Sequence, residues 1–247
     1  MTRYKVTIEY DGRGLAGWQR QKDQPSVQQH IEEAIYKFCG QEIRIQGAGR
    51  TDAGVHALGQ VASFEITGDY STETVMNAIN FHLGEAAISL LDCTVVDEEF
   101  NARFSAKSRH YLYRIINRHA PLTVDQGLAW RVKRNLNSDA MHDAAQLLIG
   151  KHDFTSFRAV ACQAKSPIRT LSRLDVSRFK NEIQIRVSAM SFLHNQVRAM
   201  VGTLSLVGLG QWSKDDLAAA LAAKDRQKAG PNAPAHGLYL TDVDYDN

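Results

Sequence analysis

The segment Gly47–His56 contains residues whose types and spacing could support a reaction. It reads Gly-Ala-Gly-Arg-Thr-Asp-Ala-Gly-Val-His, so three glycines surround the guanidinium of Arg50 and the carboxylate of Asp52. Glycines allow sharp turns and a close approach of the backbone to a ligand. A carboxylate held in such a loop can serve as a nucleophile or as a general base. Asp52 is therefore the first candidate catalytic residue.

The loop does not match the common phosphate-binding motifs. A dinucleotide fingerprint would need glycine where Asp52 stands, and a P-loop would need Lys and Ser or Thr after Gly54, where the sequence has valine and histidine. In a structural alternative, Asp52 bonds its own backbone in a turn and Arg50 is its surface partner. The apolar strand expected from Gln60 onward would anchor the loop, which favours a held site over a mobile tip.

Cysteines and histidines form no metal-binding pattern. Cys39, Cys93 and Cys162 lie far apart without CxxC spacing, and the nine histidines include no HExxH pair. An odd number of separated cysteines favours reduced thiols over a disulfide framework. We therefore expect neither a metal site nor a bound cofactor.

Basic residues are concentrated in two stretches, although the formal net charge is only +2. Phosphate contacts supply much of the affinity of nucleic-acid-binding proteins, so local positive charge is what a polyanionic partner needs. A charge run is more often a solvated face, and both readings stay open at this point. The first stretch contains Arg103, Lys107, Arg109, Arg114, Arg118, Arg131, Lys133 and Arg134, and the second contains Arg158, Lys165, Arg169, Arg173 and Arg178.

The expected elements alternate between half-buried strands and amphipathic helices. Ser26 and Gln29 predict a capping box, and Gly40 predicts the end of that helix. Ser213 and Asp216 predict a second capped start. Strands are expected at 4–10, 43–45, 60–66, 87–96, 109–117, 171–179, 182–190 and 238–243, and helices at 27–38, 72–83, 138–149, 195–207 and from 213 onward.

This order of elements predicts the α+β class, with mixed or antiparallel sheets flanked by helices. The two halves have similar element orders, which suggests pseudo-duplicated subdomains at 1–106 and 107–247 with the active-site cleft between them. The N-terminus shows no apolar export signal, and no apolar run approaches the roughly 18 residues of a membrane span. We expect a cytoplasmic protein without a membrane partner.

The loop around Asp52 also resembles the signature loop of the tRNA pseudouridine synthase A family. Further motifs of this family are matched in order over nearly the whole chain, which makes coincidence implausible. The matching segments are Tyr10–Gly12, Gly17–Gln21, Gly49–Ala57, Phe100–Ala106, Arg109–Tyr113, Asp153–Phe157, Phe192–Arg198 and Ala233–Leu240.

The resemblance implies the pseudouridine synthase fold and the isomerisation of uridine to pseudouridine at tRNA positions 38, 39 and 40, in the anticodon stem-loop. The base is detached from ribose C1′, turned over and rejoined through its carbon 5, so no cofactor is required. A base inside a stem must leave the stack to be reached. The resemblance further implies a homodimer that binds tRNA.

Roles for individual residues also follow from the resemblance. Asp52 is the catalytic carboxylate, and Arg50 occupies the space vacated by the base, although a plain ion pair with Asp52 is an alternative. Tyr111 stacks on the flipped uracil, unless it or Tyr113 is a core residue. Arg198 pairs with Asp52 and keeps it ionised, the alternative being a surface arginine with a buried stem. Substrate contacts are expected from Phe100, Arg103, Arg109, Arg158 and Lys165, with Lys107 beside them.

Two other classes of function remain open from the sequence. A non-catalytic RNA-binding protein would explain the basic stretches and tyrosines, but not a carboxylate in a glycine-rich loop. A hydrolase of nucleosides or glycans would need paired carboxylates, and Asp11 is the nearest second acid.

Overall fold

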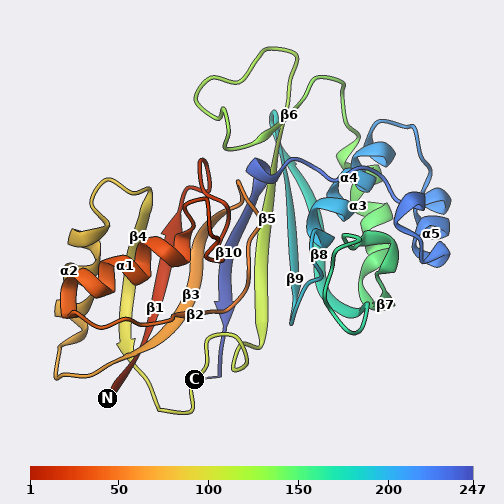
Figure 1. The fold of residues 1–247 in the computed structure, drawn as a ribbon. Helices are drawn as coiled ribbons and strands as arrows, with labels where there is room; N and C mark the ends of the chain where they lie inside the picture. Colours follow the sequence, from red (N-terminus) through yellow and green to blue (C-terminus); the bar gives the residue numbers. More distant parts are fainter. Residues whose placement is uncertain (247) are drawn as a thin grey trace. The chain divides into compact units, whose positions relative to one another are not determined.

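The computed structural model describes residues 1–246, which form two compact units (Figure 1). The first unit comprises Met1–Lys107 together with the chain from Tyr239 onward, and the second comprises Ser108–Leu238. The boundary at 106 expected from the sequence assigned the last strand to the second half. The structure assigns it to the first, because it pairs with a strand there and because the Lys107 N–H donates to the Asp244 carbonyl.

The first unit contains a mixed sheet in the order β4-β1-β3-β10. Its strands are β1 (Thr2–Tyr10), β2 (Gln46–Gly47), β3 (His56–Ile66), β4 (Ile88–Val95) and β10 (Leu238–Asp244). β1 runs antiparallel to β3 and β4, β2 is antiparallel to β3, and β10 is parallel to β3. The alternation along β1 places Tyr4, Val6, Ile8 and Tyr10 in the core.

Helices α1 (Val27–Cys39) and α2 (Thr72–Leu83) pack against each other in the first unit. Ser26 accepts the Gln29 N–H, and Gly40 ends α1 with φ 71°. The expected capping box is only half formed, because the Gln29 side chain donates to Glu33 instead of returning to Ser26. The bounds of α2 agree with those predicted from the sequence.

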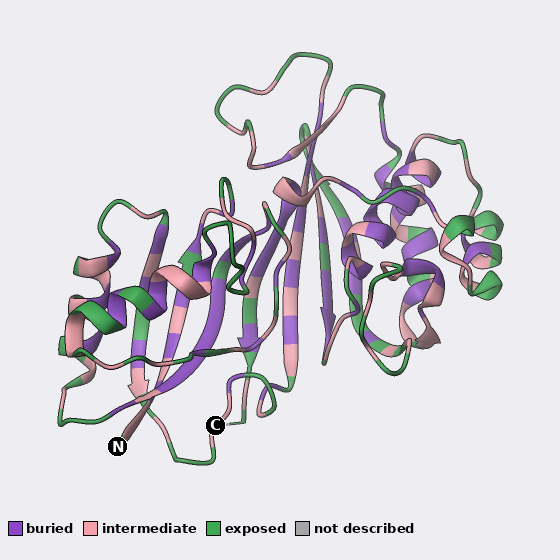
Figure 2. Ribbon diagram, viewed as in Figure 1, coloured by how far each residue is buried: buried purple, intermediate pink, exposed green. Residues whose placement is uncertain are grey.

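The second unit contains a sheet in the order β5-β9-β8-β7, with β6 parallel to β5. Its strands are β5 (Ser108–Asn117), β6 (Trp130–Val132), β7 (Gly150–Asp153), β8 (Ile168–Phe179) and β9 (Glu182–Ala189). The neighbouring strands of the four-stranded order are antiparallel. Figure 2 shows buried residues alternating with less buried ones along β5. The class is therefore α+β, as predicted.

Three α-helices accompany the second sheet: α3 (Ser138–Ala145), α4 (Gln196–Gly208) and α5 (Lys214–Ala223). α4 is largely buried and packs closely on the following loop, since a Cβ at Gly202 would lie 1.7 Å from the Pro231 carbonyl oxygen. The short 3-10 helices are Gln146–Leu148, Thr155–Phe157, Arg226–Lys228 and Ala235–Gly237.

Several expected elements differ from those in the structure. The strand expected at 43–45 lies instead at Gln46–Gly47, and the α-helix expected to reach residue 149 ends at Ala145 and continues as a 3-10 turn. β6 and β7 were not predicted, because three or four residues are too few to show a strand period. No helix among residues 1–246 has both the length and the apolar character needed to cross a membrane.

The capping box that begins α5 provides a test of local stability. Ser213 accepts the Asp216 N–H through its side chain, and the Asp216 carboxylate accepts the Ser213 N–H at 2.7 Å. We expect Ser213→Ala to lower the free energy of unfolding by about 1 kcal/mol, because the cap satisfies otherwise unpaired N–H groups. Urea denaturation measures this, with Ser213→Thr as the control that keeps the hydroxyl. Equal losses in both variants would contradict the capping role.

Candidate active site

The loop that contains Asp52 is fixed to the first unit along most of its length. The Ala48 N–H donates to the Val61 carbonyl at 2.8 Å, and the Gln60 side-chain amide donates to the Gly49 carbonyl at 2.9 Å. Closer to Asp52, the Thr51 hydroxyl bonds the Tyr10 hydroxyl at 2.7 Å. The sequence expectation of a loop anchored on the strand that follows it is therefore confirmed at Gln60.

The segment between β1 and α1 forms the other support of this loop. The Trp18 N–H donates to the Thr51 carbonyl at 3.1 Å, and the Trp18 ring packs so closely on Gly47 that a Cβ there would lie 2.4 Å from it. A Cβ at Gly12 would lie 2.2 Å from the Val55 carbonyl oxygen. Gly12 thus permits close contact with the backbone of the loop, and Gly47 permits close contact with the Trp18 ring.

Asp52 itself lies in a tight turn and is half-buried. Its main-chain carbonyl accepts the Val55 N–H at 3.1 Å, and Gly54 supplies the positive φ of 77°. A main-chain bond therefore closes this turn. Burial raises the pKa of Tyr10, whose hydroxyl bonds the neighbouring Thr51, to about 12.

Arg50 lies two residues before Asp52 and is exposed. Among the ion pairs of residues 1–246, Arg50 has no carboxylate partner. The alternative of a plain ion pair with Asp52 is therefore not supported. An exposed guanidinium on a fixed loop is available to an anionic ligand.

A buried imidazole connects the loop to the end of β1. His56 is 1% exposed, accepts the Gly12 N–H through Nδ1 at 3.0 Å, and stacks on the Tyr239 ring at 4.7 Å. The Asp11 carboxylate lies 3.1 Å from the same nitrogen and also accepts the Arg13 N–H and guanidinium. Asp11 therefore has structural partners on both oxygens, which disfavours its use as the second acid of a hydrolase. His56 falls within the matched motif Gly49–Ala57, but no local sequence pattern indicates its contacts with Gly12 and Tyr239.

The dependence of the free energy of unfolding on pH provides a test of the contacts among Asp11, Arg13 and His56. Burial by itself raises the pKa of Asp11, but the hydrogen bonds from Arg13 and the nearby His56 outweigh it and lower the pKa below its ordinary 3.8. A lowered folded-state pKa stabilises the protein above the ordinary value, and this stabilisation disappears as the pH falls through the folded-state value. We expect Asp11→Asn to lower the free energy of unfolding at pH 7 and to have a much smaller effect below about pH 3. Urea denaturation at both pH values measures this, and equal losses would contradict it.

In the second unit, Tyr111 and Tyr113 share one face of β5, as the strand period predicts. Tyr113 is fully buried and its hydroxyl donates to the Pro234 carbonyl at 2.8 Å, so it is the core residue of the pair. Tyr111 is 9% exposed, and its ring meets the Phe192 ring edge-on at 5.2 Å. Tyr111 is thus the member of the pair that is nearer to the surface.

Arg198 lies half-buried on α4 with a fixed guanidinium. Its Nε donates to the Ala233 carbonyl at 2.8 Å and its Nη1 to the Asn195 side-chain oxygen at 3.1 Å. Arg198 also lowers the pKa of Tyr113 in part, against the larger raising effect of burial. This arginine is not a surface residue with a free head group. Asp52 and Arg198 belong to different units, and their pairing stays a prediction.

The remaining predicted contacts fall into exposed and packed positions. Arg103 and Lys165 are exposed and Arg158 is half-buried, whereas Arg109 is buried and donates to the Met190 carbonyl. Phe100 packs against the Tyr245 ring at 5.0 Å. Arg103 and Lys165 are therefore the members best placed for a phosphate, while Arg109 and Phe100 have evident structural roles.

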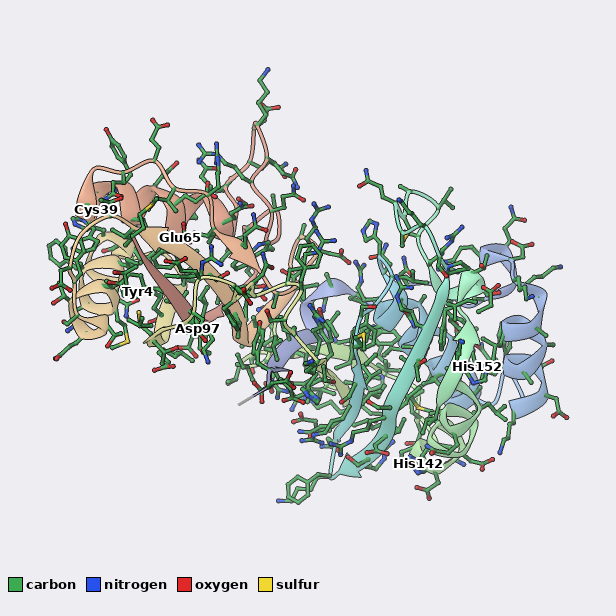
Figure 3. All side chains as sticks on the ribbon, turned by 90° about the horizontal axis from the view of Figure 1, so that it is seen from below. Tyr4, Cys39, Glu65, Asp97, His142 and His152 are labelled. Atoms are coloured by element: carbon green, nitrogen blue, oxygen red, sulfur yellow. The ribbon has the colours of Figure 1, made fainter. Side chains whose placement is uncertain are left out.

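Within residues 1–246, no group of three or more His, Cys, Asp and Glu side chains could hold a metal ion. His142 and His152, labelled in Figure 3, bond the backbone of their own unit. His142 Nδ1 accepts the Val176 N–H at 3.2 Å, and His152 bonds the Ile149 carbonyl at 2.8 Å. These histidines therefore have structural partners.

Comparison with known proteins places this geometry in a family of enzymes. A family model described as tRNA pseudouridine synthase matches residues 6–105 and 144–246. Proteins named tRNA pseudouridine synthase A are similar over their full length: the one from Parvibaculum lavamentivorans is 56% identical over 100% of both chains, and the one from Maricaulis maris is 55% identical over 99% of this chain and 98% of its own. The one from Brucella ovis is 55% identical over 99% and 98%.

These matches identify an isomerase that acts on uridine in tRNA. The chain belongs to the tRNA pseudouridine synthase family. Among solved structures, one titled as a Cbf5-Nop10-Gar1 complex aligns with 81% of this chain and 53% of its own, with 10% identity and a TM-score of 0.34, a level from which we draw no conclusion.

Proposed function

We propose that this enzyme converts uridine to pseudouridine in the anticodon stem-loop of tRNA, at positions 38, 39 and 40. The observation that carries the proposal is the fixed loop of the first unit, which holds a half-buried carboxylate beside an exposed arginine. Membership of the family supports tRNA as the substrate. The position within tRNA rests on the motif resemblance described above.

The reaction needs one carboxylate and no redox step. The bond from ribose C1′ to uracil N1 breaks, the base turns and a bond from C1′ to C5 forms. The proton of C5 is released to solvent, and N1 takes up a proton in its place. Asp52 acts as the nucleophile or base in this sequence. Arg198 pairs with Asp52 and, as an opposite charge close to it, favours its ionised form.

Arg50 and Tyr111 act on the RNA around the extruded base. Extrusion costs a few kcal/mol, which contacts to the vacated space and to the flipped base must offset. The exposed guanidinium of Arg50 fills that space, and the Tyr111 ring stacks on the uracil. Base stacking on an aromatic ring contributes roughly 1–3 kcal/mol. Three neighbouring targets imply recognition of RNA shape more than of base edges.

The proposed function also includes contacts with RNA phosphates and the assembly of two chains. Arg103, Arg158 and Lys165 bind the RNA backbone, with Arg109 and Phe100 supporting the same surface from more packed positions. The enzyme acts as a homodimer in the cytoplasm, so that phosphate contacts are distributed over two chains of modest net charge.

The deciding experiment measures tritium release from tRNA labelled at uracil carbon 5, followed by mapping of pseudouridine in the product. We expect release by the wild type and new pseudouridine at positions 38–40, and transcripts with cytidine at all three positions should release no tritium. Tight binding without release would favour a non-catalytic RNA-binding protein. Formation of free uracil would favour a hydrolase, and pseudouridine outside the anticodon arm would contradict the proposed target.

A further inference from the structure

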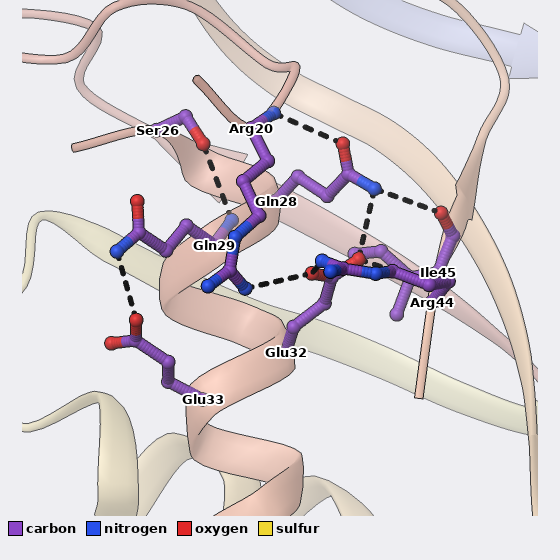
Figure 4. Close-up of polar contacts among 8 residues, drawn as sticks. All are labelled: Arg20, Ser26, Gln28, Gln29, Glu32, Glu33, Arg44 and Ile45. Carbon is purple, nitrogen blue, oxygen red and sulfur yellow. Dashed lines mark hydrogen bonds and ion pairs between the residues drawn. The ribbon is translucent and has the colours of Figure 1, made fainter. Parts of the chain in front are cut away.

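A buried carboxylate on α1 holds two arginines at the surface of the first unit (Figure 4). The side chain of Glu32 is only 3% exposed, and its Oε2 accepts Nη1 of Arg20 at 3.2 Å and Nη1 of Arg44 at 2.5 Å. Its Oε1 accepts the Gln28 side-chain amide at 2.8 Å and the Ile45 N–H at 3.3 Å. All four contacts converge on one carboxylate, so both guanidiniums are fixed next to each other.

This cluster contains more positive charge than the burial of Glu32 requires. One guanidinium would be enough to neutralise the carboxylate. The second arginine brings the net charge of Glu32, Arg20 and Arg44 together to +1. Each arginine is bound through Nη1, and the side chains remain 40% exposed at Arg20 and 67% exposed at Arg44. Their other N–H donors are therefore available to an anion at the surface.

The two arginines come from the segments that lead into the loop of Asp52. Arg20 follows Trp18, whose N–H bonds the carbonyl of Thr51. Arg44 precedes β2, from which the chain enters Gly47–His56. The backbone of Arg20 is also fixed, since its N–H donates to the Gln28 side chain at 3.1 Å. An anion bound by this pair would thus be held by the same rigid part of the unit that supports the loop.

We propose that Arg20 and Arg44, held by Glu32, form a binding site for a backbone phosphate of the RNA substrate. The inference rests on the proposed function for the identity of the polyanion, and it concerns residues outside the two basic stretches. Two adjacent guanidiniums match the geometry of a phosphodiester through charge-assisted hydrogen bonds. Because Glu32 already orders both side chains, little rotamer freedom is lost on binding.

Among residues 1–246, Arg20 and Arg44 form ion pairs with Glu32 and with no other acid. Glu33 is engaged by Gln29 at 2.8 Å one turn along the exposed side of α1. Glu42 and Asp23 are exposed, and the exposed Lys22 lies next to Asp23 in the chain. Phosphate contacts of this kind contribute affinity that depends on salt but not on base sequence.

The test compares tRNA affinity of the full-length protein across a series of salt concentrations. Arg20→Ala and Arg44→Ala should each weaken binding of an unmodified tRNA transcript several-fold to about tenfold, and each should reduce the slope of log K against log salt by about 1. Lys37→Ala is the matched control, because it removes an exposed cation from the far end of the same helix. It should leave the slope unchanged, and Arg44→Lys should recover only part of the affinity.

Thermal unfolding of each variant separates phosphate binding from a purely structural role. If the arginines only stabilise Glu32, Arg20→Ala and Arg44→Ala will lower the melting temperature and leave both the salt slope and the affinity of the folded protein unchanged, which would overturn the proposal. Tritium release is measured in parallel. A wild type that releases no tritium contradicts the proposed function, whereas a changed salt slope in the variants would still support the phosphate site.

Discussion

Asp52→Asn should abolish turnover while tRNA binding survives. The substitution keeps the size of the side chain and removes the negative charge on which attack or proton transfer depends. Loss of a nucleophile or base lowers turnover by factors on the order of 10⁴ in well-studied enzymes, and we expect a loss of that size. The bonds that fix the loop involve Ala48, Gly49 and Thr51, so the loop should keep its conformation.

Single-turnover tritium release and equilibrium binding together measure this result. Asp69→Asn is the control, because Asp69 is an exposed carboxylate of the same unit. It should retain wild-type turnover. If Asp52→Asn lost affinity by the same factor as rate, the residue would act in binding, and the catalytic assignment would be contradicted.

Gly17→Ala should disrupt the support of the same loop. Gly17 has φ +94°, and an added Cβ would lie 2.4 Å from the Thr51 carbonyl oxygen and 2.8 Å from the Asp52 carbonyl carbon. These are backbone atoms, which cannot move without moving the loop. A displacement of about 1 Å at a catalytic group can lower the rate roughly a hundredfold, and we expect at least that loss in turnover.

Gly14→Ala provides a matched control for backbone strain. Gly14 also has a positive φ, 76°, but an added Cβ would meet no atom within 4 Å. Both substitutions therefore cost about 1–2 kcal/mol for the left-handed conformation, and only Gly17→Ala adds the clash. Turnover and the free energy of unfolding in urea are measured for both variants. A loss of turnover in Gly17→Ala beyond that in Gly14→Ala gives the effect of the clash with the loop. Equal turnover in the two variants would show that close packing on Thr51 does not position the loop.

Elements in which the hydrophobic period repeats several times, or which begin at a capping residue, could be predicted from the sequence. β1 and β9 show clean alternation, α2 has the predicted bounds, and the capping box of α5 has the predicted partners. β6 and β7 show no such pattern, because pairing with a neighbouring strand defines them. The grouping of β10 with the first unit also depends on pairing between distant segments, which no local pattern encodes.

In the candidate site, too, residue types could be predicted from the local sequence, whereas contacts between distant segments could not. The residue types around Asp52 identified the loop, and the glycines at 12 and 17 fell within matched motifs, but their contacts with Val55 and Thr51 depend on tertiary packing. Arg109 is buried and donates to the Met190 carbonyl, and its contact with a phosphate stays a prediction. Period two along β5 indicates only the face on which Arg109 lies, not the segments that pack over it. Composition offered no signal for the excess charge around Glu32.

The position of β10 has a consequence for synthesis on the ribosome. Tyr239 and Leu240 pair with His56 and Ala57, the first residues of β3. Domains tend to fold as units while the nascent chain emerges from the N-terminus. The start of β3 can pair with β10 only after the chain beyond residue 238 has been synthesised. The whole second unit is therefore translated before the sheet of the first unit is complete. The first unit is therefore complete only when synthesis is nearly finished, and a prematurely terminated chain would leave an open strand edge prone to aggregation.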